Sequence, residues 1–289
     1  MYLVNTIIIG AQKAGTTTLY NWLAQHPDVY GPKGMKDFPF FCDDMYYEKG
    51  IKWFATNYSQ YKNQKIILHG SVNYLYFSQV SAQRIYQYNS NTKLIALLRN
   101  PVDRAYSAFW QQKKVGNENI DDFSYAVEKE KERCKGTFQD QANLTYIDHG
   151  FYAHQLKKYY ETFPSTNIKV IIFEEMIRNN AETVSDLYKF MGIDSYFKPN
   201  YVVKNESGLP RFKIINNLLQ KGIKFDSIKN LLPINYRILI KNMLRELNTR
   251  KIKYEPLGHE IRSDLMNIYL NDINELERLL NRDIKSLWS

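Results

Sequence analysis

The run Ile7-Ile8-Ile9-Gly10-Ala11-Gln12-Lys13-Ala14-Gly15-Thr16-Thr17-Thr18-Leu19 joins an apolar segment to a glycine-bounded loop and then to a second periodic segment. This order predicts a buried strand, a tight loop and the first turn of a helix. Glycine at each end of the loop lets the backbone curl and approach a ligand closely. Because backbone N–H groups and the positive end of the helix dipole attract anions, the run predicts a phosphate-binding loop.

The loop has the glycine spacing of a Walker A loop, G-x-x-x-x-G-K-[ST], with one departure. Thr16 follows the second glycine, where a nucleoside triphosphatase carries its lysine. The lysine of this loop is Lys13, inside the loop itself. The displaced lysine indicates a related anion site that serves a different donor. It disfavours a P-loop kinase or NTPase, which is the alternative enzyme.

The composition predicts a globular, cytoplasmic protein. Apolar residues make up 44% of the 289 residues, enough for a full core. No apolar run approaches the ~20 residues of a membrane span, and the N-terminus lacks the features of a secretory signal. The two cysteines, Cys42 and Cys134, are too few for a disulfide framework and have no metal-ligand spacing. We therefore expect free thiols in a reducing compartment.

The net charge of +9 arises in one segment, residues 211–253, which holds eleven Lys/Arg and two Asp/Glu. A basic patch this local is typical of a surface that meets an acidic partner, unless it is the solvated face of two helices. We expect it to dock the acceptor or an anionic lipid that carries the acceptor, which would make the protein membrane-peripheral. We do not expect a nucleic-acid partner. The alternative is a non-catalytic binder of anionic glycans or membrane surfaces, built around this segment.

Predicted strands alternate with predicted helices along the chain. Apolar runs predict strands at residues 4–9, 66–68, 93–98 and 168–173. Periodicity and capping residues predict helices at residues 16–25, 50–60, 78–88, 101–110, 121–134, 152–162, 181–191 and 260–280, with two more in the basic segment. This alternation predicts an α/β fold, a three-layer αβα architecture around a central parallel sheet. We expect a single domain over residues 1–289.

A second anion site is predicted at the end of strand 93–98. Arg99 follows this strand directly, Asn100 is a good N-cap for the next helix, and Ser107 lies two helical turns further on. Ligands of open parallel sheets bind at the carboxyl ends of the strands, and arginine is a fork-shaped donor to phosphate. Two anion sites at separate strand ends fit a nucleoside ligand with phosphate groups at both ends.

Two segments, Gly10–Thr17 and Leu98–Ser107, resemble the donor-binding signatures of the sulfotransferases that use 3′-phosphoadenosine 5′-phosphosulfate (PAPS). The likeness is greater to the heparan-sulfate and bacterial carbohydrate branch than to the cytosolic aryl branch. It extends over nearly the whole chain, through Lys36–Phe41, Gly50–Phe54, Ser71–Tyr76 and the run from Tyr269 to Asp283. The resemblance implies a P-loop NTPase-like sulfotransferase fold. It also implies metal-independent, in-line sulfuryl transfer from PAPS to a hydroxyl acceptor, which is a saccharide or a lipid-linked glycan, with 3′-phosphoadenosine 5′-phosphate (PAP) as product.

The resemblance also implies residue roles. Arg99 and Ser107 hold the 3′-phosphate of the donor, and Arg211 closes over the nucleotide. Lys13 neutralises charge on the bridging oxygen as the S–O bond breaks. The 5′-phosphosulfate is held by Lys13, Ala14, Gly15, Thr16, Thr17 and Thr18.

The catalytic base of the family is a glutamate, and Asp37 stands at its position. An aspartate can take a hydroxyl proton but is one methylene shorter, so the acceptor would have to lie closer. His69, where many relatives have glutamate, is a second candidate base. At this point the choice between Asp37 and His69 is open.

Overall fold

The computed structural model describes residues 3–32, 35–202, 209–210, 249–250 and 255–288. The chain divides into two compact units. The first comprises Met1–Ala105, Ile147–Val203 and Arg262–Ser289, and the second comprises Tyr106–Tyr146 and Lys204–Ile261. A single domain over the whole chain stays a prediction.

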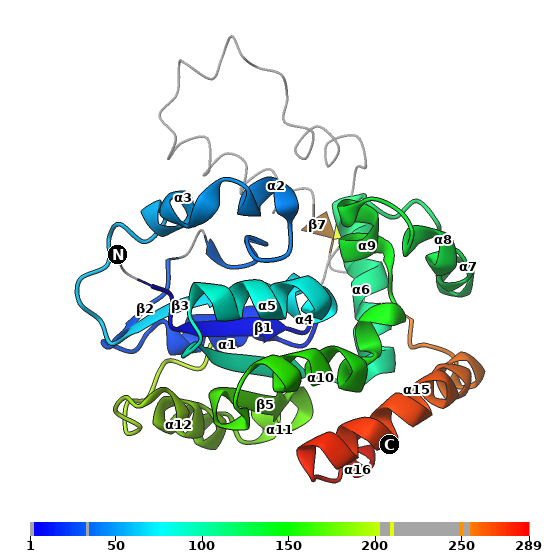
Figure 1. The fold of residues 1–289 in the computed structure, drawn as a ribbon. Helices are drawn as coiled ribbons and strands as arrows, with labels where there is room; N and C mark the ends of the chain where they lie inside the picture. Colours follow the sequence, from blue (N-terminus) through cyan, green and yellow to red (C-terminus); the bar gives the residue numbers. More distant parts are fainter. Residues whose placement is uncertain (1–2, 33–34, 203–208, 211–248, 251–254, 289) are drawn as a thin grey trace. The chain divides into compact units, whose positions relative to one another are not determined.

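The first unit contains a five-stranded, all-parallel sheet with the order β2-β3-β1-β4-β5 (Figure 1). The strands are β1 (Thr6–Gly10), β2 (Val29–Tyr30), β3 (Ile66–Gly70), β4 (Lys93–Leu98) and β5 (Ile168–Ile172). All residues of β1 and β3 are buried, as are Leu94–Leu98 of β4. This explains why these strands appear in the sequence as continuous apolar runs rather than alternating ones.

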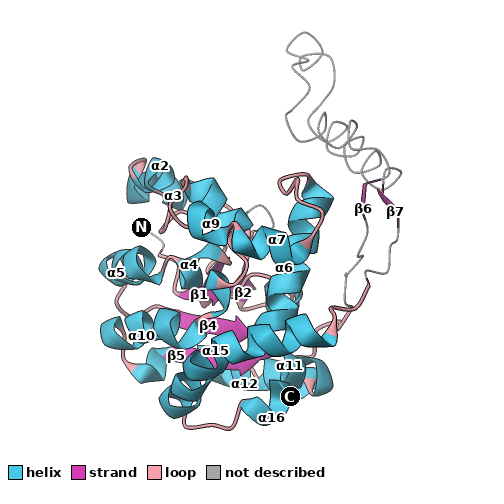
Figure 2. Cartoon of the chain, turned by 90° about the vertical axis from the view of Figure 1, so that its right-hand side faces the viewer, coloured by secondary structure: helices cyan, strands magenta, loops and turns pink. Residues whose placement is uncertain are grey.

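Helices cover both faces of this sheet. The helices of the first unit are α1 (Thr16–Leu23), α2 (Asp44–Tyr47), α3 (Gly50–Thr56), α4 (Asn73–Tyr76), α5 (Ser78–Tyr88), α10 (Tyr152–Thr162), α11 (Phe173–Arg178), α12 (Asn180–Met191) and α16 (Lys285–Trp288). On one face the Tyr159 hydroxyl of α10 is hydrogen-bonded to the Ser81 hydroxyl of α5. On the other face the Tyr188 hydroxyl of α12 donates to the backbone carbonyl of Trp22 in α1. Figure 2 shows α5 and α10 on one side of β4 and β5, with α11 and α12 on the other. The predicted αβα fold is confirmed.

Helices make up most of the described part of the second unit. It holds α7 (Phe123–Glu128), α8 (Glu130–Arg133), α9 (Phe138–Leu144) and a short antiparallel pair, β6 (Leu209–Pro210) with β7 (Thr249–Arg250). Two further helices, α6 (Pro101–Val115) and α15 (His259–Leu280), have residues in both units.

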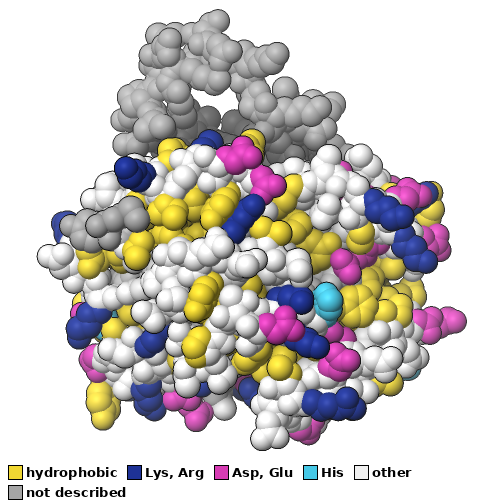
Figure 3. Space-filling model, viewed as in Figure 1, with side chains coloured by type: hydrophobic (Ala, Val, Ile, Leu, Met, Phe, Trp, Pro, Cys, Tyr) yellow, Lys and Arg dark blue, Asp and Glu magenta, His cyan; other side chains and the backbone are white. Residues whose placement is uncertain are grey.

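Several sequence predictions need correction. The helix predicted over 121–134 is two helices, because Lys129 ends α7 and precedes α8. The strand β2 lies outside the predicted strands, and α9, which a Thr137–Asp140 capping box begins, lies outside the predicted helices. The two helices predicted in the basic segment 211–253 lie outside the described residues. Of that segment the structure describes residues 249–250, which form β7. On the face drawn in Figure 3, the basic and acidic side chains of the described residues are interspersed.

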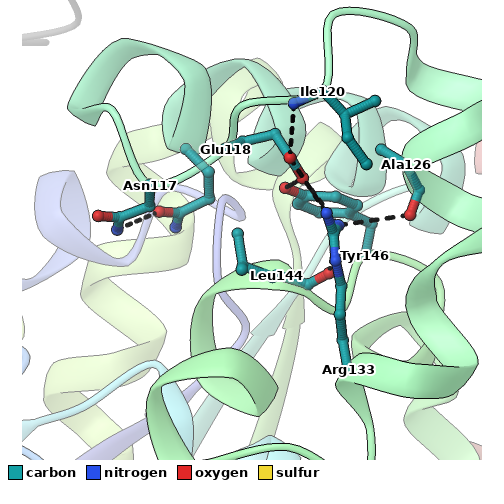
Figure 4. Close-up of polar contacts among 8 residues, drawn as sticks. Asn117, Glu118, Ile120, Ala126, Arg133, Leu144 and Tyr146 are labelled. Carbon is teal, nitrogen blue, oxygen red and sulfur yellow. Dashed lines mark hydrogen bonds and ion pairs between the residues drawn. The ribbon is translucent and has the colours of Figure 1, made fainter.

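A buried ion pair holds the second unit together (Figure 4). Arg133 Nη1 lies 2.7 Å from Glu118 Oε2, and the side chain of Glu118 is only 2% exposed. The Tyr146 hydroxyl donates to the same carboxylate at 2.8 Å, and the N–H of Ile120 donates at 2.9 Å. Burial raises the pKa of Tyr146, so its hydroxyl stays a donor. Arg133 also donates to the carbonyl of Leu144, at 3.1 Å.

Replacing Arg133 with methionine is expected to destabilise the protein by about 3–5 kcal/mol, because it leaves the buried Glu118 carboxylate without its cation. Urea denaturation followed by circular dichroism measures the loss. Lys129→Met is the matched control, since the pair of Lys129 with Glu132 is exposed and its loss should change stability little. Equal effects of the two substitutions would contradict this account of the unit.

Candidate functional site

The loop after β1 has the backbone expected of an anion cradle. Gly10 ends the strand, and Gly15, in the left-handed region with φ of 90°, precedes α1 without any side-chain cap. Lys13 is also left-handed, with φ of 64°. The first N–H groups of a helix have no intrahelical partner, and no acidic residue occupies the first turn of α1. The loop therefore offers donors and a helix dipole to an anion, without a carboxylate to repel it.

Neighbouring side chains explain why glycine stands at both ends. A Cβ on Gly10 would lie 2.7 Å from the Cβ of Leu75, and one on Gly15 would lie 2.8 Å from the Phe173 ring. Within the loop and first turn, Thr17 is exposed, whereas Ala14, Thr16 and Thr18 are buried. Tight packing thus fixes the cradle from two sides.

Arg99 lies at the carboxyl end of β4, the strand next to β1, and reaches the loop. Its Nη1 donates to the carbonyl of Lys13 at 3.2 Å. Its guanidinium carbon lies 5.1 Å from the centroid of the Phe173 ring, a cation–π contact. The two segments that the sequence singled out at separate strand ends therefore meet in the fold.

Asn100, the residue after Arg99, caps the next helix, α6, as predicted. The Asn100 side chain accepts from the N–H groups of Val102, at 3.0 Å, and Asp103, at 3.2 Å. Ser107 is a half-buried residue of α6 in the second unit. Because Arg99 belongs to the first unit, a shared role for Arg99 and Ser107 stays a prediction. Arg211 lies outside the described residues.

Asp37 is an exposed carboxylate beside the carboxyl end of β3. Its side chain is 47% exposed and pairs with the ammonium of Lys36, whose side chain is 9% exposed. Its backbone is left-handed, with φ of 69°, and its N–H donates to the carbonyl of Gly70 at 2.7 Å. Burial lowers the pKa of Lys36, and the Asp37 carboxylate opposes that shift. Asp37 thus lies at the edge of the sheet where ligands bind.

His69 is a core residue. Its ring is fully buried between two tyrosines, with Nδ1 2.9 Å from the Tyr58 hydroxyl and Nε2 2.7 Å from the Tyr74 hydroxyl. Tyr74 donates to the carbonyl of Phe38, which indicates that Nε2 of His69 carries the proton. Burial lowers the pKa of His69 to about 3. These contacts support a structural role, in which His69 and Tyr74 anchor the backbone beside Asp37.

The sequence profile of the sulfotransferase domain family matches residues 4–249. The chain belongs to this family. The predicted resemblance is confirmed, and the chain carries an enzyme domain of the sulfotransferase type. Family membership favours sulfuryl transfer over both alternatives, the P-loop kinase or NTPase and the non-catalytic binder.

This sulfotransferase is similar to two heparan sulfate enzymes and to one solved structure. It is 25% identical to the human bifunctional heparan sulfate N-deacetylase/N-sulfotransferase 3, over 96% of this chain and 30% of the relative. It is 29% identical to the human heparan sulfate glucosamine 3-O-sulfotransferase 5, over 66% of this chain and 54% of the relative. The chain therefore spans about a third to a half of these relatives. A sulfotransferase from Alicyclobacillus acidocaldarius shares the fold, with a TM-score of 0.74, 24% identity and full coverage of both chains.

Among the described helices, none is both long and apolar enough to cross a bilayer. Within the same residues, no three His, Cys, Asp or Glu side chains gather into a potential metal site.

Sequence reasoning missed several residues that shape the site of the sulfotransferase. Phe173 lies between the loop and Arg99, and Glu174 accepts the N–H of Asn100 at 3.0 Å. Both follow β5 directly, so the rule that ligands bind at the carboxyl ends of strands could have identified them. Tyr152, whose hydroxyl donates to the carbonyl of Arg99 at 2.9 Å, had no such signal, because it begins a helix far along the chain.

Proposed function

We propose that this sulfotransferase moves the sulfuryl group of PAPS to a hydroxyl group of a saccharide. The observation that carries the donor assignment is the contact between Arg99 and the carbonyl of Lys13. It brings a permanent cation to the cradle at the start of α1. A nucleotide whose 5′-phosphosulfate lies on the cradle can then present a 3′-phosphate to Arg99, which ATP does not have.

This placement of the nucleotide assigns roles in the reaction to Lys13 and Asp37. In an in-line transfer the nucleophilic oxygen, the sulfur and the leaving oxygen lie in a row, so orientation supplies much of the rate. Lys13 neutralises the charge that the leaving phosphate acquires. Asp37, exposed and held by its N–H contact with Gly70, takes the proton of the acceptor hydroxyl.

An aromatic cluster next to Asp37 supports a saccharide acceptor. The Phe38 ring lies 4.6 Å from the Tyr46 ring and 5.8 Å from the Trp53 ring, and all three side chains are partly exposed. The ammonium of Lys49 lies 4.7 Å from the Trp53 centroid. Sugar rings present C–H groups that pack on aromatic faces, and a cation suits acidic sugars. The names of the two human relatives, both heparan sulfate enzymes, point to the same acceptor class.

A transfer assay with ³⁵S-labelled PAPS tests the proposal, with unsulfated heparosan oligosaccharides (intact and N-deacetylated), chondroitin, glycolipids and phenols as acceptors. We expect label in a saccharide, in an acid-stable O-sulfate. Label in an acid-labile N-sulfate would show that the acceptor group is an amine and would contradict the hydroxyl part of the proposal. Transfer to phenols alone would contradict the saccharide assignment.

Calorimetry tests the donor independently of the acceptor. We expect PAP to bind, and ATP with Mg²⁺ to bind much more weakly. Tight binding of ATP with no binding of PAP would contradict the donor assignment.

A further inference from the structure

The peptide group between Arg99 and Asn100 is held at both of its polar ends. Its carbonyl accepts from the Tyr152 hydroxyl at 2.9 Å, and its N–H donates to Glu174 Oε1 at 3.0 Å. Burial raises the pKa of Tyr152, so its hydroxyl remains a donor. These two bonds fix the backbone from which the Arg99 side chain extends toward the loop.

Trp288, on the last described helix, contacts both groups that hold this peptide. Its Nε1–H donates to Glu174 Oε2 at 3.1 Å, and its ring centroid lies 6.0 Å from that of Tyr152. Its own carbonyl accepts from Asn100 Nδ2 at 2.8 Å. Trp288, Glu174 and Asn100 therefore form a closed ring of three hydrogen bonds, and Trp288 is only 4% exposed.

The helix that carries Trp288 is itself anchored. Glu277 of α15 accepts from the N–H groups of Ile284 and Lys285, both at 2.9 Å, where α16 begins. Arg282 forms an ion pair with Glu175, the neighbour of Glu174 on α11. The position of Trp288 is therefore set by the fold and not by the ring of three hydrogen bonds alone.

The helix that carries Tyr152 is tied to the same C-terminal region. Asp272 of α15 accepts from the N–H groups of Ala153, at 3.0 Å, and His154, at 3.2 Å, in the first turn of α10. A carboxylate in this position caps the helix and stabilises its N-terminus. Both sides of the Arg99–Asn100 peptide are thus connected to the C-terminal helices.

We propose that Trp288 is a positioning residue for the 3′-phosphate of the donor. It holds Glu174 and Asn100, and through them it sets the direction in which Arg99 leaves β4. This inference rests on the proposed function, in which Arg99 binds that phosphate. It predicts that the C-terminal helices affect one end of the nucleotide selectively, although they contribute no group to the cradle at the start of α1.

Trp288→Phe tests the inference, because phenylalanine keeps an aromatic ring but lacks the N–H. Calorimetry gives the Kd of PAP and of adenosine 5′-phosphate (AMP), which lacks the 3′-phosphate. We expect the wild type to prefer PAP. In the variant the affinity for PAP should fall about tenfold, the usual consequence of disturbing a hydrogen bond to a charged group, while that for AMP stays within about twofold.

Trp22→Phe is the matched control. Trp22 is equally buried, at 2% exposed, but lies on α1, whose N-terminus belongs to the cradle. It should leave the ratio of the two dissociation constants unchanged, even if both shift. If a thermal-shift assay finds Trp288→Phe unfolded, Tyr152→Phe replaces it, since it removes only the hydroxyl that donates to the carbonyl of Arg99.

An equal loss of affinity for PAP and AMP would reduce Trp288 to a structural residue and overturn the inference, and so would unchanged affinity for PAP. A wild-type protein that binds PAP and AMP equally well would instead contradict the proposed role of Arg99, and the inference would fall with it.

Discussion

Lys13→Ala is expected to lower kcat by about 10²–10³-fold, the usual effect of removing one group that stabilises developing charge in the transition state. The backbone should survive the change. Lys13 adopts a left-handed conformation, but alanine carries a Cβ as lysine does, so the strain is the same in both proteins. The contact with Arg99 uses the carbonyl of Lys13 and is also kept.

Two measurements separate the chemical role of Lys13 from binding. Charge that develops on the leaving oxygen is present only in the transition state, so kcat at saturating PAPS should fall much more than the affinity for PAP. Lys13→Arg keeps the cation and should recover part of the rate. A variant with wild-type kcat and weak PAP binding would make Lys13 a ground-state ligand of the donor and contradict its catalytic role.

The features predicted best from sequence were local ones. The buried strands β1, β3 and β4 each contain a continuous apolar run, the loop after β1 has its two glycines, and Asn100 caps the helix that follows it. In all these cases the residues that specify the structure are neighbours in the chain. Because parallel strands end at the same edge of a sheet, the predicted fold put Arg99 and the loop on one edge, but their contact is a finding of the structure.

The features that were missed depend on partners far along the chain. The strand β2 has two residues, too few for any periodicity, and is defined by its pairing with β3. His69 is a polar residue at a strand end, which favours a catalytic role until Tyr58 and Tyr74 are seen to enclose it. The contact of Trp288 with Glu174 joins residues 114 positions apart, and neither residue carries a local signal of it.

Asp37→Asn is expected to lower kcat by about 10²–10⁴-fold, the range for loss of a general base, while the affinity for PAP stays unchanged. The substitution suits this position, since asparagine has the same size and tolerates the left-handed backbone that Asp37 adopts. The N–H contact with Gly70 is kept as well. Steady-state kinetics with saturating PAPS and the best saccharide acceptor measures the effect.

Asp44→Asn is the matched control, because Asp44 is a surface carboxylate, 75% exposed, that pairs with Arg84. It should keep wild-type kcat. If Asp37→Asn also kept kcat within about twofold, Asp37 would not be the base. His69 could not simply replace it, since its ring is fully buried and both ring nitrogens are hydrogen-bonded to tyrosines. The proton would then leave to solvent or to a group of the acceptor, and the rate should depend on the acidity of the acceptor hydroxyl.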